Sequence, residues 1–561
     1  MLHCNRYTFL VLVSFPYKLS GKDRGRRALC RRCCRRLAGA CCNVYTTLPL
    51  TEEWWLAPLR ILGVYSALLY AVFSQEDEAW GLNDSMGVLL NTVVMASYIL
   101  VGSLLAVGYR RGIRADRDYY VAGYGLSGLL SALTYAATTY SAFMIVGLVG
   151  FTYATGVGAL GFELSYFVAT LFLLTLFAPR VWRMARERGW ISPGEMLADL
   201  YGSRRLALAA SLIYLYALVP YMAAQVKGIA EAVKAAVGGG MGYSLGVAVG
   251  LGLMAFWTII AGVWSVAVTD AMQGLWMIAS SLLLLGWLLA HVSASMGLEE
   301  ASRALEAKGL LGITGFWKPH VFLGFTIPWV FFAVTNPQVV QRLYMPRDER
   351  ALKTMVKWFA VFGISYTVIV TMIGLFTRSL SELGELPLIH EKDAVTPTLL
   401  GQAPSLLAAM VFTSIVAAAV STADSIALSV ASSVVRDLLA GRPAAGSLAV
   451  GRAVTFALIL AAGALSYARV GFIVALSVLS SYILLSLAPP TILAWISPGR
   501  ARESGGRAVV SVIVSAALLT AIALAYGVKA LTATFMKLPV SAWILIVSTL
   551  ILLAPNPSGR R

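Results

Sequence analysis

The sequence predicts an all-α protein that crosses a membrane many times, and three observations support this fold class. Of its 561 residues, 59% are hydrophobic and only 13% are charged. Apolar runs of roughly 20 residues recur from residue 86 to the end, and each is long enough to cross a hydrocarbon core as a helix. These runs are rich in Ala, Leu, Gly and Ser and lack the alternating pattern of barrel strands.

Hydropathy predicts about 13 to 14 transmembrane helices. The first is weak because it contains Arg60. The predicted spans are 54–74, 87–108, 125–148, 157–179, 206–236, 242–261, 266–292, 319–341, 355–377, 404–435, 449–467, 470–495, 508–527 and 538–554.

The basic residues predict the orientation of these spans. The formal net charge is +17, but most arginines fall in short loops on one side, so membrane insertion explains the charge better than a nucleic-acid surface does. The other side carries the acidic stretches "SQEDE" and "SELGELPLIHEKD". We therefore expect a multi-pass protein of the cell membrane with its C-terminus, including the tail 555–561, in the cytoplasm.

The N-terminal 85 residues differ in composition from the rest of the chain. All six cysteines lie within the first 42 residues, most of them in "CRRCCRRLAGACC". This run lacks the paired CxxC spacing of a thiolate metal site, and a palmitoylated patch is a second weak alternative. We expect a basic, cysteine-containing extension with one weak span over 1–85, followed by a membrane domain over 86–554.

Four stretches place small or polar residues where lipid burial disfavours them. Polar groups in hydrocarbon are costly and tend to face a bundle interior or a water-filled path. Each stretch also has an ordinary explanation. The first, "SALTYAATTYSAFMIVGLVGFTYATG" at 131–156, could be a close helix contact, and the second, "GVWSVAVTDAMQG" at 262–274, could contain a helix cap. The third, "IPWVFFAVTNPQVVQRLYMPRDERALK" at 327–353, could be a plain kink, and in the fourth, "AAAVSTADSIALSVASSVVRDLL" at 417–439, the hydroxyls could bond to the preceding turn.

The first and fourth stretches together suggest an ion site. Carbonyls freed by a broken helix near residue 137 and hydroxyls near residue 421 would form an all-oxygen cage without a carboxylate. Such a cage suits a hard monovalent cation that must both bind and leave. Transporters built from repeats place ion sites of this kind between broken helices.

The same stretches resemble the sodium:solute symporter family, which includes sodium/proline, sodium/pantothenate and sodium/glucose symporters. "STADSIALSVASSVVRDL" resembles the family's eighth core helix, and "GVWSVAVTDAMQG" is similar to its G-x-W-x-V-x-x-T-D-x-x-Q stretch. "NPQVVQRLYMPRDERALK" resembles its cytoplasmic turn, and "YYVAGYGLSGLLSALTYAATTYSAF" the approach to its first core helix. The resemblance covers about 86–495. It implies a LeuT-like five-plus-five inverted repeat, over about 125–292 and 319–487, with extra N- and C-terminal helices.

The resemblance also implies a function and a set of site residues. It implies sodium-coupled symport of a small organic solute, such as an amino acid or a carboxylate, into the cell by alternating access, with sodium as the coupling ion and no other cofactor. Sodium would bind at Ala137, Tyr140, Ala418, Ser421 and Thr422, and Asp270 and Asp424 would couple the ion to transport. The solute would lie beside Thr139, Ser141, Trp329, Ala333 and Pro337. In the proline symporter an aspartate and a tyrosine occupy the positions of Thr139 and Ala333, which argues against proline as the solute.

Three alternatives remain to be compared with this interpretation. A proton-coupled symporter on the same fold could use Lys227 and Glu231, one turn apart on the 206–236 helix, although the two could simply pair with each other. An intramembrane enzyme is disfavoured because the "GLSG" motif at 125–128 lies near a span end and the four histidines are scattered. A channel is disfavoured because no repeated filter-like sequence is visible. We therefore expect a transporter and not an enzyme.

Overall fold

The structure is a computed structural model that describes residues 84–109, 115–237, 242–440, 448–468 and 473–555. The weak predicted span 54–74 and all six cysteines lie outside the described residues. All described residues belong to a single unit of the chain.

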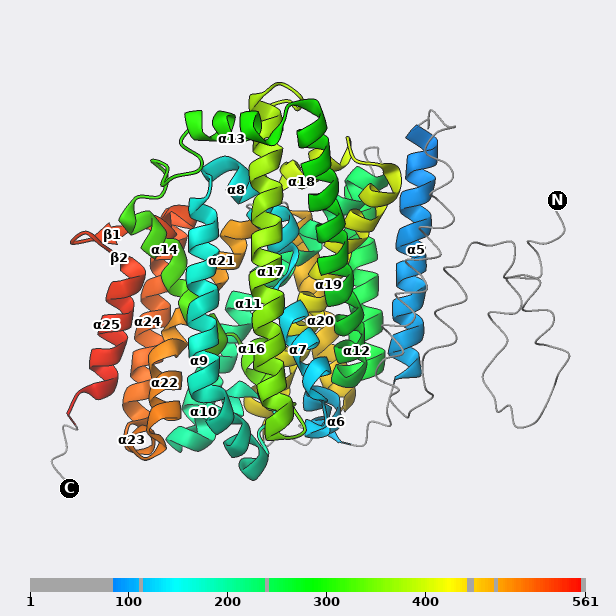
Figure 1. Ribbon diagram of the computed structural model, residues 1–561. Helices are drawn as coiled ribbons and strands as arrows, with labels where there is room; N and C mark the ends of the chain where they lie inside the picture. Colours follow the sequence, from blue (N-terminus) through cyan, green and yellow to red (C-terminus); the bar gives the residue numbers. More distant parts are fainter. Residues whose placement is uncertain (1–83, 110–114, 238–241, 441–447, 469–472, 556–561) are drawn as a thin grey trace, which may run out of the picture. The chain divides into compact units, whose positions relative to one another are not determined.

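The described chain is a succession of α-helices with short 3-10 or π-helical segments, which are labelled η, and one small β hairpin (Figure 1). The elements up to the middle of the chain are α5 (Asp84–Gly108), α6 (Asp116–Val121), η2 (Ala122–Tyr124), α7 (Gly128–Thr139), η3 (Phe143–Leu148), α8 (Val149–Thr155), α9 (Gly158–Arg188), α10 (Pro193–Tyr201), α11 (Arg204–Val237), α12 (Gly242–Ser295) and α13 (Leu298–Ala307). They are followed by α14 (Pro319–Val330), α15 (Phe332–Thr335), α16 (Pro337–Arg342), α17 (Glu349–Glu382), η4 (Lys392–Ala394), α18 (Val395–Leu400), α19 (Ser405–Ser433) and η5 (Val434–Leu438). The last elements are α20 (Leu448–Tyr467), α21 (Ile473–Leu484), η6 (Leu485–Leu487), α22 (Ala488–Ile496), α23 (Pro498–Glu503), α24 (Gly505–Tyr526), η7 (Gly527–Thr532), β1 (Thr534–Phe535), β2 (Leu538–Pro539) and α25 (Val540–Leu553).

The predicted fold class is confirmed. Among the described residues, ten helices are long and apolar enough to cross a membrane, and a bent pair of helices forms one more span. Two shorter apolar helices, Pro319–Thr335 and Val540–Leu553, account for the other predicted spans from 87–108 onward. The strands β1 and β2 make only a two-residue antiparallel hairpin next to α25.

Gly262 separates the two spans that α12 contains. The predicted spans 242–261 and 266–292 are continuous in the structure except for a break at this glycine, where φ is 61° and ψ is −174°. A positive φ is readily adopted only by glycine. In addition, a Cβ atom at this position would lie 2.9 Å from the ring of Tyr119. Gly262 therefore allows both the turn and the close approach of α6.

Two predicted spans are broken rather than continuous. The helices α7 and η3–α8 meet at an angle of 49° after a break at residues 140–142. The span from α14 to α16 is interrupted at Phe331 and again at Asn336, whose ψ of 115° is extended. Pro337 then begins α16. The first N–H groups of a helix have no partner within it, so a proline at this position costs no helical hydrogen bond. The third polar stretch thus marks a discontinuous helix and not a plain kink.

Burial separates central helices from peripheral ones. The apolar window of α19 is 83% buried, whereas that of α5 is 28% buried and that of α24 is 33% buried. Helices α11 and α12 pack on α19, and α7 packs on α12, α17 and α19. Large apolar side chains such as Leu100 and Leu104 are exposed on α5, as expected for a helix that faces lipid. The fourth polar stretch therefore lies in one of the most buried helices of the described bundle.

A candidate ion and solute site at a broken helix

The break after α7 exposes backbone groups inside the bundle. Tyr140 still donates its N–H to the carbonyl of Ala136 (2.8 Å), but its ψ of 100° turns the chain out of the helix. Two residues further on, the N–H of Ala142 donates to the side-chain oxygen of Gln225 on α11 (3.2 Å). Because the helix stops here, the carbonyls of its last turn lose their partners within the helix. Those carbonyls are then available to other groups.

Two hydroxyls of α19 donate hydrogen bonds to these carbonyls. The Ser421 hydroxyl donates to the carbonyl of Ala137 (2.8 Å) and lies 3.1 Å from that of Ala418. The Thr422 hydroxyl lies 3.1 Å from the carbonyl of Thr138 and 3.4 Å from that of Ala137. The structure thus brings Ala137, Ala418, Ser421 and Thr422 together. The fifth expected sodium ligand, Tyr140, is the residue at which α7 breaks.

We call the five expected ligands, Ala137, Tyr140, Ala418, Ser421 and Thr422, the oxygen cage. All five residues are buried, and hydrogen bonds link the oxygens of Ala137, Ala418, Ser421 and Thr422. Carbonyl and hydroxyl oxygens are hard, neutral ligands that suit a monovalent cation better than a transition metal. Among the described residues, no cluster of three or more acidic, histidine or cysteine side chains could hold a metal ion. The chemistry of the cage therefore favours Na⁺ or a similar ion.

Asp270 belongs to a buried ion pair, which contradicts the helix-cap explanation. It lies eight residues beyond the break at Gly262, inside α12, and is 1% exposed. Its Oδ2 atom is 3.0 Å from the guanidinium of Arg342 and accepts a hydrogen bond from the Thr134 hydroxyl (2.5 Å). A buried carboxylate needs such partners because desolvation is costly.

Arg342 connects this ion pair to the oxygen cage. It lies just beyond the predicted span 319–341, in the stretch that resembles a cytoplasmic turn, but it is only 3% exposed. Its guanidinium donates to the Ser425 hydroxyl (2.5 Å) as well as to Asp270. Ser425 in turn donates to the carbonyl of Ser421 (2.7 Å). A chain of hydrogen bonds therefore joins Asp270 to the helical turn that holds the cage.

Asp424 is a second buried carboxyl near this network. It is 1% exposed, and its Oδ1 atom has no hydrogen-bond partner. It directly precedes Ser425, which accepts the hydrogen bond from Arg342. Inside a membrane, a carboxyl group in such surroundings is stable only when a proton or a cation compensates its charge.

Three of the five expected solute residues lie on the segments next to the first break, and the other two lie further away or point elsewhere. Ser141, Trp329 and Ala333 lie near the break of α7 and on α14–α15, and Phe143 packs on the Trp329 ring at 5.1 Å. Pro337 lies beyond the second break and begins α16, which packs on α7 and α19. The Thr139 hydroxyl points back along α7 and donates to the carbonyl of Tyr135 (2.8 Å).

Sequence reasoning missed two buried polar residues of α9, one of which packs on Trp329. Glu163 on α9 is 1% exposed, and its Oε2 atom has no partner. One turn later, the Tyr166 ring packs edge-on against Trp329 (5.0 Å), and neither its hydroxyl nor the Trp329 indole N–H has a partner. The signal was available, because Glu163 is an acidic residue inside the predicted span 157–179.

Comparison with known proteins identifies the family of this chain. The model of the "Sodium:solute symporter family" matches residues 119–492, well over half of the chain. The chain belongs to the sodium:solute symporter family. Its relatives include the sodium/pantothenate symporter of Haemophilus influenzae, 24% identical over 64% of this chain and 74% of the relative. The sodium/pantothenate symporter of Escherichia coli is 26% identical over 42% of this chain and 49% of the relative. The sodium/myo-inositol cotransporter 2 of Oryctolagus cuniculus is 26% identical over 44% of this chain and 39% of the relative.

Solved structures support the LeuT-like fold. A Na⁺-coupled sialic acid symporter in an outward-open state matches with a TM-score of 0.66 at 18% identity, covering 83% of this chain and 98% of that one. A nucleobase-cation-symport-1 family transporter matches with a TM-score of 0.50 at 14% identity, and the match covers 79% of this chain and 93% of that one. The expectation of sodium-coupled symport is confirmed at the level of the family, whose members are transporters and not enzymes. The proton-coupled alternative is not favoured.

Proposed function

We propose that this symporter binds its coupling sodium ion in the oxygen cage. The observation that carries the proposal is the contact of the Ser421 and Thr422 hydroxyls with the carbonyls of Ala137 and Thr138, released by the break of α7. An entering cation would take the place of the hydroxyl protons between these oxygens, and the hydroxyls would rotate to present their lone pairs. Because the cage carries no formal charge, the ion can also leave it.

The buried ion pair next to the cage is the proposed coupling element. Asp270 and Arg342 reach the cage through Ser425, and Asp424 follows Thr422 by two residues on the same helix. A cation in the cage changes the field felt by both carboxyls, since few charges or waters screen it inside a membrane. We therefore assign Asp270 and Asp424 to ion coupling.

The solute is proposed to bind between the break of α7 and the α14–α15 segment. Ser141, Trp329 and Ala333 form the centre of this region, and Thr139 and Pro337 belong to its margins. Three buried polar atoms without partners, on Glu163, Tyr166 and Trp329, support this position. They offer one acceptor and two donors to a small organic solute, such as an amino acid, a carboxylate or a related compound.

We infer that the protein lies in the cell membrane with its C-terminus in the cytoplasm. The support is the distribution of arginines and lysines among the loops. A fluorescent protein fused to the C-terminus should be fluorescent and should resist protease added to intact cells. Digestion of the fused protein from outside would contradict this orientation.

Reconstituted vesicles test the transport function. The purified protein in proteoliposomes should accumulate a solute from an external mixture of amino acids and carboxylates when a sodium gradient is directed inward. A potassium gradient should give no accumulation, and Ser421→Ala/Thr422→Ala should abolish the sodium-driven signal. Accumulation driven by a proton gradient without sodium would favour the proton-coupled alternative.

A further inference from the structure

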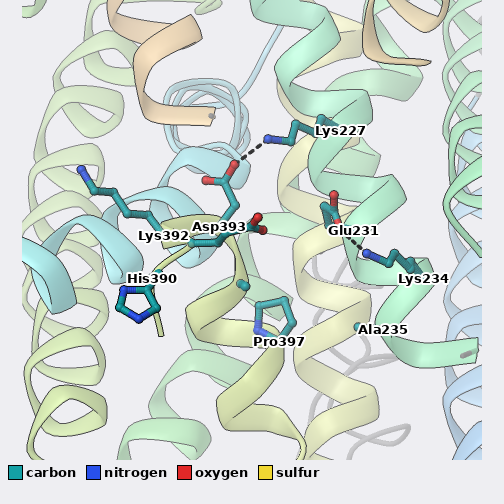
Figure 2. A pocket seen from close by; sticks show the side chains of 10 residues that line it. Lys227, Glu231, Lys234, Ala235, His390, Lys392, Asp393 and Pro397 are labelled. Atoms are coloured by element: carbon teal, nitrogen blue, oxygen red, sulfur yellow. Dashed lines mark hydrogen bonds and ion pairs between the residues drawn. The ribbon is translucent and has the colours of Figure 1, made fainter. Parts of the chain in front are cut away.

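A cavity lies at the end of the bundle that carries α18 (Figure 1), and Figure 2 shows the side chains that line it. It has a volume of about 540 Å³. One wall is the C-terminal part of α11, with Lys227, Glu231 and Lys234, and the other is the segment from His390 to Pro397. With the proposed orientation, this cavity faces the outside of the cell.

An ion pair joins the two walls. Lys227 lies 2.8 Å from the Oδ2 atom of Asp393, and the two side chains are only 14% and 10% exposed. The same Oδ2 atom accepts a hydrogen bond from the backbone N–H of Ile473 (3.2 Å). The other oxygen, Oδ1, has no hydrogen-bond partner. A buried acceptor without a donor is costly, so Asp393 offers a position for a donor from a ligand.

This pairing differs from the one that the sequence suggested. Lys227 and Glu231 lie one turn apart, but the structure pairs Lys227 with Asp393 and Glu231 with Lys234 (3.6 Å). The contact of Lys227 therefore crosses from α11 to the segment before α18. A ligand that separates Lys227 from Asp393 would act on both walls of the cavity.

The lining carries both signs of charge in balance. The lining contains three lysines, Lys227, Lys234 and Lys392, and three acidic residues, Glu231, Glu391 and Asp393. Lys392 extends away from Lys227 (Figure 2), and its ammonium lies over the rings of Phe151 (5.1 Å) and Phe316 (5.8 Å). Burial lowers the pKa of Lys392. Because buried charges of both signs line the cavity, a ligand that carries both charges can pair with each sign, whereas a simple anion or cation can pair with only one.

The cavity lies beside the broken helix. Thr396, at the start of α18, donates its hydroxyl to the carbonyl of Ile145 (2.6 Å), four residues after Ser141. On the opposite wall, Gln225 accepts the N–H of Ala142 two residues before Lys227. Both walls are thus attached to the segment that follows the break of α7. A solute held in the cavity would be close to the proposed solute site.

We propose that this cavity binds the charged end of a small zwitterionic solute, with the carboxylate on Lys227 and the ammonium on Oδ1 of Asp393. Binding exchanges one internal ion pair for two pairs with the ligand, so both buried charges stay compensated. The site would hold the solute before it reaches the broken helix. This inference rests on the proposed transport function and narrows its solute to a compound that carries both charges.

Matched ligands test the charge requirement. The full-length protein in detergent is titrated by calorimetry in potassium buffer without sodium, so that sodium-dependent solute binding does not contribute. The probes are L-leucine, its anion-only counterpart 4-methylpentanoate and its cation-only counterpart 3-methylbutylammonium, together with glycine, acetate and methylammonium. At least one zwitterion should bind about tenfold more tightly than either of its counterparts.

Variants test the position of the site. Lys227→Met and Asp393→Asn should each weaken zwitterion binding about tenfold or more, because each removes one of the two charges. The exchange Lys227→Asp/Asp393→Lys keeps both signs and should restore much of the binding. Lys308→Met is the control, because its ion pair with Glu382 (3.1 Å) lies outside the cavity lining. Folding of each variant is checked by its stabilisation with sodium.

Several results would overturn the proposal. These are equal binding of the singly charged probes, unchanged binding by Asp393→Asn, or no zwitterion binding by a protein that still responds to sodium. Glycerophosphoethanolamine, which carries the zwitterionic headgroup of a lipid as a phosphodiester, is titrated as well, and a clear preference for it would assign the cavity to lipid instead. Absence of the sodium response in the unmodified protein would contradict the proposed function, and not this site in particular.

Discussion

At the scale of single residues, hydroxyls and one arginine organise the interior of the bundle. Ser421 and Thr422 could be selected from the sequence because hydroxyls stand out in an apolar helix. Arg342 could not be selected in this way. It lies five residues after Pro337, at the edge of a basic stretch, and its sequence context is typical of a loop residue. Only the three-dimensional structure shows that α16 turns this side chain inward to Asp270 and Ser425.

Removal of the two cage hydroxyls should abolish the response to sodium. Ser421→Ala/Thr422→Ala deletes two of the five proposed ligands, and we expect sodium affinity to fall about tenfold or more. The apparent dissociation constant is measured from the rise of the thermal midpoint with sodium. Ser433→Ala removes a hydroxyl from the last turn of α19 and should leave this constant unchanged. Unchanged affinity in the double variant would exclude the cage.

The buried ion pair should show strong coupling in a double-mutant cycle. Asp270→Asn or Arg342→Gln alone leaves an uncompensated charge inside the bundle, and each should cost about 3 kcal/mol or more of stability. The two together should cost less than the sum, since neither charge remains. Thermal midpoints of the four proteins give the comparison. Arg347→Gln, from an exposed pair with Asp348, should have little effect. Additive losses would contradict the pairing.

At the scale of elements, interruptions of regular helix position the site. Proline in "TNPQ" and small residues in "AATTYSA" indicated where spans would break, because they remove a donor or allow the chain to unwind. The partners that stabilise the breaks could not be predicted. Gln225 lies on α11, far along the chain from Ala142, and an apolar pattern does not specify such a pair.

Gln225 should stabilise the break in α7. Gln225→Met keeps the length of the side chain but removes the acceptor for the N–H of Ala142, so we expect a loss of about 1–3 kcal/mol in stability. The thermal midpoint measures the loss, and sodium affinity should fall as the break loosens. Gln402→Met is the control, because that glutamine is exposed and bonds only to a loop carbonyl. Equal midpoints for the two variants would be inconsistent with this role.

Gly262 should be required for the turn within α12. Gly262→Ala places a Cβ atom at a φ of 61° and 2.9 Å from the Tyr119 ring, so we expect a loss of about 1–3 kcal/mol. Gly286→Ala is a matched control in the second span of α12, where a Cβ atom meets nothing within 4 Å. That variant should be neutral or slightly more stable in thermal melting. A stable Gly262→Ala protein would argue against the strained turn.

At the scale of the whole molecule, composition alone predicted most of the architecture. Long apolar runs specify membrane helices because every backbone group must be satisfied within lipid, and each predicted span from 87–108 onward corresponds to helices of the structure. Side-chain contacts between helices that are distant in the sequence were harder to predict. Lys227 looked like a partner of Glu231, yet it reaches Asp393 on a segment that lies more than a hundred residues further along the chain. Local spacing does not encode such a contact.

The most direct test of the central claim is a titration of the purified protein with sodium, and in parallel with potassium, at constant ionic strength and pH. Thermal stability or intrinsic tryptophan fluorescence reports ion binding, because a ligand that binds only the folded state stabilises it. The oxygen cage predicts a saturable response to sodium, little response to potassium, and loss of the response in Ser421→Ala/Thr422→Ala. A folded protein that ignores sodium but responds to pH would contradict this account and identify the buried carboxyls as proton carriers.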